Sequence, residues 1–198
     1  MQYALGYDAR AIIHVIDYSA LTDNALFAML PDRQHRDRAF AELYRRYSSR
    51  IFAYCLKVLG EREAANDAFQ DTFTRFFNSA RVDREMTNLP AYLLRIARNV
   101  CLNEKRAKST PVSIDDIEVP AFDTPYEKTE LLQLISTALE LLPLQYREAF
   151  VLREYDGMAY AEIAEITGIT EESARIRVFR ARDKIRMILK PYLVDLTQ

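Results

Sequence analysis

Two clusters of basic residues have the types and spacing that could do chemistry in this chain. Residues 175–190 contain seven basic residues and one acid, Asp183. Residues 36–108 contain 15 basic and 9 acidic residues, whereas residues 109–128 carry a net charge of −4. Guanidinium groups bind phosphates and guanine edges, so these local excesses indicate a polyanionic partner although the whole chain has a net charge of −2.

Few groups suit catalysis or metal binding. His14 and His35 have no neighbouring cysteine and no HExxH spacing, and Cys55 and Cys101 form no CxxC pair. We find no Ser/His/Asp set and no phosphate-cradling glycine loop. We therefore expect no metal, no cofactor and no enzyme activity. The cysteine usage indicates a reducing cytoplasm, and without a long apolar N-terminal core we expect no signal peptide and no membrane insertion.

The sequence predicts helices, because apolar residues recur at steps of three and four and no alternating strand pattern is present. The basic residues therefore lie on helices. This periodicity stops between Ala107 and Tyr126, where three prolines lie among Ser, Thr and Asp, as in a linker. The sequence predicts an all-α fold of two small helical domains. The predicted boundaries are an extension of unknown role at 1–21, domains at 22–108 and 125–198, and an acidic flexible linker at 109–124.

A helix-turn-helix is predicted near the C-terminus. Residues 160–167 have helical apolar spacing and end at Gly168, which readily adopts a left-handed cap, and Thr170 can cap the next helix. On that helix, from 171 to 188, one buried stripe follows at steps of four and three: Ala174, Val178, Ala181, Ile185 and Ile188.

The opposite face of that last helix combines apolar and basic residues. Ile176 and Phe179 lie there beside Arg175 and Arg180. The apolar pair could pack on a neighbouring helix, or it could contact thymine methyls while the arginines reach guanine edges in a major groove. The density of arginine favours DNA. Replacing Arg175 should then weaken binding sequence-selectively by about 1–3 kcal/mol.

A second basic face is predicted on a helix over 90–108. Glu104 is the only carboxylate of this segment, so ion pairs within the helix cannot neutralise its cations. A solvated surface is one explanation, and a phosphate backbone is the one that we favour. Because a polar loop over 78–88 leads into the helix, a splayed base of single-stranded DNA could stack there. The predicted single-strand-binding residues are Asn78, Tyr92, Arg95, Arg98, Asn99, Lys105 and Arg106.

A helix over 64–78 is predicted to turn its aromatic residues inward and a row of acids and amides outward. The pattern alone leaves two explanations for the outward row: a protein-docking surface, or a surface that keeps the domain soluble. The outward row contains Asp67, Gln70, Asp71, Thr74 and Asn78.

Two sets of motifs resemble the sigma-70 family. Similar to its region 2 are Ala39-Phe-Ala-Glu-Leu-Tyr-Arg-Arg-Tyr, Asp67-Ala-Phe-Gln-Asp-Thr-Phe and Ala91-Tyr-Leu-Leu-Arg-Ile-Ala-Arg-Asn. Similar to its region 4 are Leu142-Pro-Leu-Gln-Tyr-Arg-Glu-Ala-Phe, Tyr160-Ala-Glu-Ile-Ala-Glu-Ile and Arg177-Val-Phe-Arg-Ala-Arg. Because only a short linker separates the two sets, the chain resembles the extracytoplasmic-function (ECF) group.

The resemblance implies an alternative sigma factor that binds core RNA polymerase and directs promoter recognition, DNA melting and initiation. It implies contacts with the β flap of polymerase. It also implies that the polymerase β′ coiled coil binds to Asp67, Gln70, Asp71 and Thr74. The single-strand residues would bind the −10 element, and an anti-sigma factor is a further implied partner. Duplex −35 DNA would be read by Ser173, Arg175, Ile176, Arg177, Phe179 and Arg180.

The chain departs from the family pattern at several positions. Ala64 and Asn66 stand where the resemblance leads us to expect acids on the docking helix, and Ile176 where a small polar residue is more usual. We hypothesise that a Ser/Thr kinase restores docking by phosphorylating Thr74 or nearby Thr72. The alternatives in function are a stand-alone helix-turn-helix regulator that binds duplex DNA without polymerase, and a protein-only adaptor with no salt-dependent DNA binding.

Overall fold

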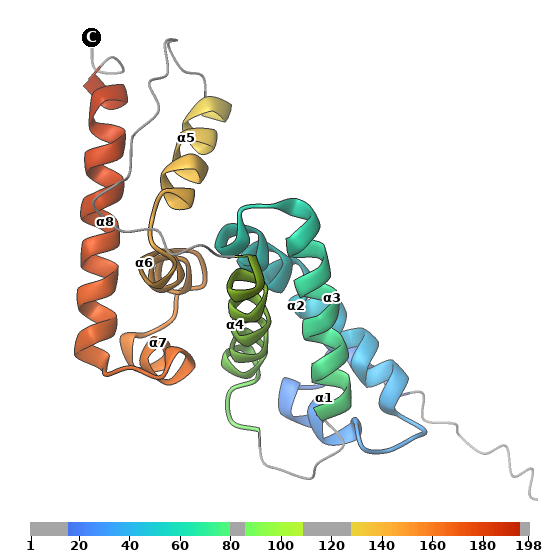
Figure 1. Ribbon diagram of the computed structural model, residues 1–198. Coiled ribbons are helices and arrows are strands. Elements are labelled where there is room, and N and C mark those ends of the chain that lie inside the picture. The colour runs from blue at the N-terminus through green and yellow to red at the C-terminus, as the bar shows by residue number, and fades with distance from the viewer. Residues whose placement is uncertain (1–15, 80–85, 109–127, 195–198) are drawn as a thin grey trace, which may run out of the picture.

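The computed structural model describes residues 16–79, 86–108 and 128–194, and every regular element among them is a helix (Figure 1). The all-α fold is thereby confirmed. The predicted linker, residues 1–15 and the start of the second domain at 125–127 lie outside the described residues. Over the described ranges, no helix is both long and apolar enough to cross a bilayer. The helices are η1 (Tyr18–Ala20), α1 (Asp23–Met29), α2 (Arg36–Leu59), α3 (Arg62–Ser79), α4 (Leu89–Lys108), α5 (Lys128–Glu140), α6 (Leu144–Phe150), the π-helix η3 (Val151–Tyr155), α7 (Tyr160–Thr167) and α8 (Glu171–Val194).

The N-terminal module comprises η1 and α1 to α4, and its long helix α2 packs against both α3 and α4. Leu43, Ile51 and Val58 of α2 recur at helical spacing and are at most 1% exposed. The aromatic residues predicted to face inward from α3 do so, since Phe73 and Phe76 are buried. Rings on α2 and α3 also contact one another along the seam between the helices.

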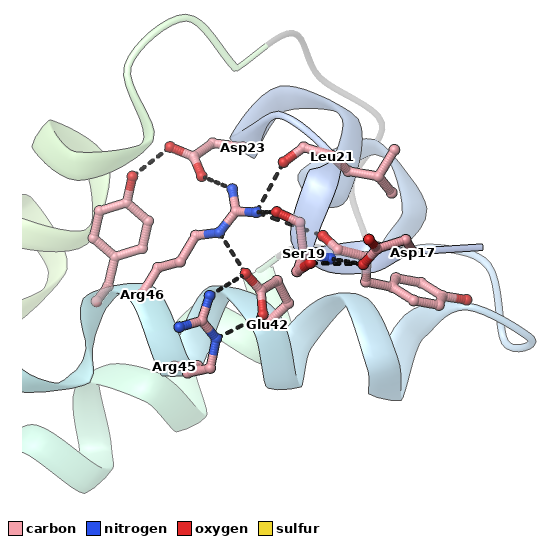
Figure 2. Close-up of polar contacts among 9 residues, drawn as sticks. Asp17, Ser19, Leu21, Asp23, Glu42, Arg45 and Arg46 are labelled. Atoms are coloured by element: carbon pink, nitrogen blue, oxygen red, sulfur yellow. Dashed lines mark hydrogen bonds and ion pairs between the residues drawn. The ribbon is translucent and has the colours of Figure 1, made fainter. Parts of the chain in front are cut away.

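A polar cluster around Arg46 fixes the start of the N-terminal module on α2 (Figure 2). The Arg46 guanidinium donates to a Glu42 carboxylate oxygen at 2.7 Å and to Asp23 at 2.8 Å. It also donates to the backbone carbonyls of Ser19 and Leu21, each at 2.9 Å. One side chain therefore holds η1 and α1 on α2 with charge-assisted hydrogen bonds.

The same cluster should make the stability of the N-terminal module depend on pH. Hydrogen bonds from Arg45 and Arg46 lower the pKa of Glu42 from 4.5 to about 2. Because the folded-state pKa lies below the ordinary value, ionised Glu42 stabilises the fold fully above about pH 4.5 and progressively less as the pH falls toward 2. Glu42→Gln should therefore lower the Tm at pH 7, and this difference from the wild type should shrink in acid.

Thermal melts of both chains between pH 7 and pH 2.5 measure the effect. Asp67→Asn removes an exposed carboxylate from α3 and serves as the matched control, which should show no such convergence with the wild type. A Glu42→Gln deficit that stays constant down to pH 2.5 would contradict the role of this ionised carboxylate.

The C-terminal module comprises α5 to α8 and contains the predicted helix-turn-helix. Gly168 ends α7 in the left-handed conformation, with φ of 70° and ψ of 35°, and Thr170 Oγ1 accepts from the backbone N–H of Ser173 at 3.1 Å. Both local predictions are confirmed. The predicted stripe of α8 is also correct: Ala174, Val178 and Ala181 are fully buried. The helix continues to Val194 through Pro191, past the predicted end at 188.

The two modules share one hydrophobic core, which the linear pattern of two domains did not predict. Leu152 and Ile163 of the C-terminal module belong to the same buried cluster as Tyr54, Leu94 and Val100 of the N-terminal module. A second, smaller cluster joins α5 and α6 to α8. In Figure 1, α6 and α7 lie between α4 and α8, so α8 forms the far edge of the molecule.

Candidate nucleic-acid interface

The outward face of α8 exposes large apolar side chains next to arginines. Phe179 is 68% exposed and Ile176 is 44% exposed, so within the described structure neither packs on a neighbouring helix as in the first alternative. Arg175 and Arg180 are exposed beside them. Ser173 and Arg177 are half-buried, Ser173 within the Thr170 cap. Apolar groups and guanidinium groups on one exposed helix face are what a major groove requires.

The side chain of Arg175 is held in place by an aromatic ring that sequence reasoning missed. The ring of Tyr160, the first residue of α7, contacts two guanidinium groups, those of Arg153 and Arg175, each 4.7 Å from the ring centroid. Arg175 also pairs with Glu171 at 3.1 Å. Arg180 donates to the Tyr146 hydroxyl of α6 at 3.2 Å. Contacts within the protein therefore orient both arginine side chains in the absence of DNA.

We expect Tyr160 to position Arg175 for base reading. Tyr160→Leu should reduce discrimination at one base pair of a −35 duplex by about 0.5–2 kcal/mol, roughly 2- to 30-fold, because the stacked guanidinium loses its platform. Tyr160→Phe keeps the ring and should retain discrimination. Binding to a duplex library measures both variants. If Tyr160→Leu weakened all sequences equally, Tyr160 would support the fold and not the reading of bases.

The basic face of α4 is paired with the C-terminal module. Arg98 Nε lies 2.6 Å from Glu148 Oε1 in an ion pair whose side chains are 17% and 3% exposed. Arg95 pairs with Glu165 of α7. The expectation that these cations lack carboxylate partners, which rested on Glu104 being the only acid nearby, is therefore wrong. Their partners lie 50 or more positions further along the chain.

The other predicted single-strand residues divide into packed and open positions. The Tyr92 hydroxyl donates to Ser79 Oγ at 2.8 Å, its ring packs edge-on against Phe27 and Phe76, and the residue is half-buried. Asn78, Asn99 and Arg106 are exposed, and Lys105 is half-buried. Residues 80–85 of the predicted polar loop lie outside the described residues.

A cavity of about 300 Å³ opens beside this face of α4. Most of its lining comes from the N-terminal module and includes Asn88 at the start of α4, and Glu165 of α7 also lines it. Asn88 caps α4 through its side-chain oxygen, which accepts from the Ala91 N–H at 3.0 Å. Residues lining the cavity include Met86, Asn88, Ala91, Tyr92, Arg95 and Glu165.

The outward row of α3 is exposed largely as predicted. Asp67, Gln70 and Thr74 are exposed, while Asp71 is half-buried and forms a 2.8 Å ion pair with Arg75. Thr72 is fully buried and its hydroxyl donates to the Ala68 carbonyl, so the hypothesis of phosphorylation at Thr72 is wrong in this fold. Ala64 is also buried, at 6% exposure, so an acid there would not lie on the outward face.

Comparison with known sequences shows the family. Residues 43–110 match the family described as Sigma-70 region 2, and residues 132–185 match Sigma-70, region 4, so the two matches together cover more than half of the chain. The ECF sigma factor SigE of Mycolicibacterium smegmatis is 27% identical over 165 residues, which is 79% of this chain but only 64% of SigE. The ECF sigma-E factor of Haemophilus influenzae is 27% identical over 188 residues, 87% of this chain and 98% of that factor.

Solved structures share the fold. The sigma factor RpoE of Bartonella quintana, in complex with the anti-sigma factor NepR, superposes with a TM-score of 0.64 at 24% identity, covering 76% of this chain and 96% of that one. CnrH, in complex with the cytosolic domain of CnrY, gives a TM-score of 0.64 at 23% identity, covering 85% of this chain and 97% of that one. On its two matched regions and its ECF relatives, the chain belongs to the sigma-70 family of RNA polymerase sigma factors, in the ECF group.

Proposed function

We propose that this sigma factor binds core RNA polymerase in the cytoplasm and directs it to promoters read at two separate elements. The observation that supports this most directly is the exposed face of α8, where Phe179 and Ile176 stand beside Arg175. A stand-alone regulator would also use such a face, but the ECF relatives favour the sigma factor. The proposed modules are residues 22–108 and 125–198, joined by the segment 109–124.

For the −35 element, we propose major-groove reading by α8. Arg175 and Arg180 would contact base edges, and Ile176 and Phe179 would contact thymine methyls. Ser173 and Arg177 would lie at the margin of this contact, because both are half-buried. Ile176 stands where the family more usually has a small polar residue. The duplex sequence that this chain prefers therefore cannot be taken over from its relatives.

For the −10 element, we propose that α4 binds the melted strand. Asn99, Lys105 and Arg106 would contact phosphates along the helix, while Arg95 and Arg98 would do so near the cavity. The wall of the cavity that the N-terminal module supplies, at the N-terminal end of α4, would receive a flipped base. Tyr92 would then form part of the cavity wall, and Asn78 would border the loop that enters it.

For polymerase, we propose docking through the outward row of α3, with the β′ coiled coil on Asp67, Gln70, Asp71 and Thr74, and a further contact of the C-terminal module with the β flap. Thr74, an exposed residue whose hydroxyl donates to the Gln70 carbonyl at 2.9 Å, remains the proposed position for a Ser/Thr kinase. We also propose an anti-sigma partner, since the similar RpoE was solved in complex with the anti-sigma factor NepR.

Run-off transcription tests the proposed function. Core polymerase, a promoter library and the full chain should yield discrete transcripts that are absent without the chain. Arg106→Ala should lower transcript yield on all templates and reduce the salt dependence of DNA binding by about one counterion, because it removes one phosphate contact. Binding of the chain to specific duplex DNA with no transcripts from any template would instead favour the stand-alone regulator.

A further inference from the structure

The N-terminal half of α4 meets three carboxylates of the C-terminal module. Glu148 of α6 pairs with Arg98, and Glu165 of α7 pairs with Arg95. Glu162 of α7 accepts a hydrogen bond from the Asn88 amide at 2.8 Å. Glu148 and Glu165 thus contact two arginines that would face the melted −10 strand, and Glu162 contacts the residue that caps α4.

Glu148 is the most deeply placed of the three. It also accepts from the Tyr54 hydroxyl at 3.2 Å, and Arg177 of α8 lies near enough to lower its pKa. Burial is the larger effect and raises the pKa of Glu148, while Arg98, Arg177 and Tyr54 oppose it. A carboxylate buried this far requires paired cations and hydrogen bonds, so Glu148 and Arg98 hold each other in place.

Further contacts hold the modules together away from the DNA-binding residues. Arg50 of α2 pairs with Asp156 at 2.7 Å and donates to the Asp156 carbonyl at 2.9 Å. The Lys57 ammonium lies 4.4 Å from the centroid of the Tyr155 ring. The carboxylates facing α4 are thus fixed by an interface that extends along α2 as well.

We propose that the C-terminal module inhibits the chain from within: Glu148 and Glu165 take the place of DNA phosphates at Arg98 and Arg95, and Glu162 holds Asn88 at the start of α4. This inference rests on the proposed function, because it assigns Arg95 and Arg98 to the −10 strand. A single strand must displace the carboxylates before it can reach those arginines. The interface on α6 and α7 is therefore an interaction surface whose partner is α4 of the same chain.

The inhibition acts on one DNA element only. Phe179, Ile176 and Arg175 on the outward face of α8 stay exposed while Arg95 and Arg98 are paired. In Figure 1, α8 lies on the side of the C-terminal module away from α4. While the two modules are in contact, the surface proposed to read duplex DNA is therefore accessible, and the surface proposed to bind single strands is blocked.

A double substitution, Glu148→Gln/Glu165→Gln, tests the inference in the full-length chain. It removes the carboxylates that hold Arg98 and Arg95. The matched control, Glu154→Gln/Glu172→Gln, removes the same charge from exposed positions of the C-terminal module, where Glu154 pairs within that module with Arg182. A second test variant, Glu162→Gln/Glu165→Gln, avoids the buried position, and its glutamine can still cap α7 through the Ala159 N–H.

Two measurements are made on each chain. The first is binding of a fluorescent 12-nucleotide mixed-sequence single strand, with the corresponding duplex in parallel. The second is the distance between spin labels at Glu63→Cys on α3 and Arg186→Cys on α8, both exposed positions. The native Cys55 and Cys101 are fully buried, which keeps them from taking up the labels.

We expect a single narrow distance for the wild type and a broad distribution for both test variants. If the open state is a minor state of about 1–10%, releasing it should tighten single-strand binding by about 10- to 100-fold. Duplex binding, and the control chain in both measurements, should stay near the wild type. The Glu162→Gln/Glu165→Gln chain should show a smaller gain in the same direction.

The inference is overturned if the wild-type distance is already broad, if the variants stay narrow, or if the modules separate without a gain in single-strand binding. Its failure is separable from failure of the proposed function. Run-off transcription by the wild type depends on the proposed polymerase and promoter contacts, and it would still be observed if the free chain were open.

Discussion

A chain with methionine in place of Arg147 is expected to lose about 3 kcal/mol or more of its free energy of unfolding. Arg147 of α6 is only 6% exposed, and burial lowers the pKa of its guanidinium. It donates to the carbonyls of Val58 at 2.9 Å and Leu142 at 3.2 Å, and also to the Glu140 carbonyl. One buried side chain thus joins the last turn of α2 to the C-terminal end of α5.

The reason for a large effect is the number of acceptors left without a donor. Methionine fills a similar volume but donates nothing, and each buried carbonyl that loses its partner costs about 1–3 kcal/mol. Because Val58 lies in the N-terminal module, the loss should also weaken the closure of the two modules. Breaking several contacts of one buried cation by a single substitution is among the strongest destabilising changes that a point mutation produces.

Urea unfolding followed by circular dichroism measures the loss. Arg186→Met, which removes an exposed arginine from α8, is the control and should change stability by less than about 0.5 kcal/mol. The free energy of unfolding lost by Arg147→Lys should lie between the losses for Arg147→Met and Arg186→Met, since one ammonium cannot reach all three carbonyls. A loss below about 1 kcal/mol for Arg147→Met would mean that water replaces the guanidinium at these carbonyls.

The helix-turn-helix was predictable from the sequence because its determinants are local. Gly168 supplies the left-handed cap, Thr170 caps the next helix, and the small residues of α8 recur at steps that fall on one face. The exposure of Phe179 followed from the same periodicity. Each of these features depends on residues within one or two turns of the chain.

The partners of α4 were not predictable by the same reasoning. Counting charges within the segment 90–108 correctly excluded local ion pairs for Arg95 and Arg98, but it says nothing of carboxylates that the fold brings from α6 and α7. Glu148, Glu162 and Glu165 lie on helices whose own periodicity gives no sign of a cationic neighbour. The shared core of the two modules was missed for the same reason, since a predicted linker suggested independent cores.

On the proposed function, pairing of the cations on α4 would keep a chain with a net charge of −2 from binding all polyanions. An open basic helix attracts any phosphate chain, because that attraction is independent of sequence. Here, the cations nearest the cavity are neutralised until the modules separate, while Arg106 and Asn99 remain exposed further along α4. Separation of the modules, and not net charge, would then control access of single strands.

Reversing two charges on α3, in the chain Asp67→Arg/Asp71→Arg, is expected to weaken association with core polymerase by at least about 30-fold, corresponding to about 2 kcal/mol or more. Asp67 is exposed and Asp71 is half-buried. The substitution removes two carboxylates from the proposed docking face and places two cations where those carboxylates would contact the β′ coiled coil. It also breaks the 2.8 Å pair between Asp71 and Arg75, which as a partly exposed pair contributes little to stability.

Binding of labelled chain to core polymerase, measured at two salt concentrations, separates docking from folding. Asp37→Arg reverses an exposed charge in the first turn of α2 and serves as the control, with an affinity near that of the wild type. Single-strand binding in the absence of polymerase should not fall in the Asp67→Arg/Asp71→Arg chain, because α4 keeps all its cations. If polymerase affinity were unchanged, the outward row of α3 would be a solubilising surface, and docking would have to involve another face of the N-terminal module.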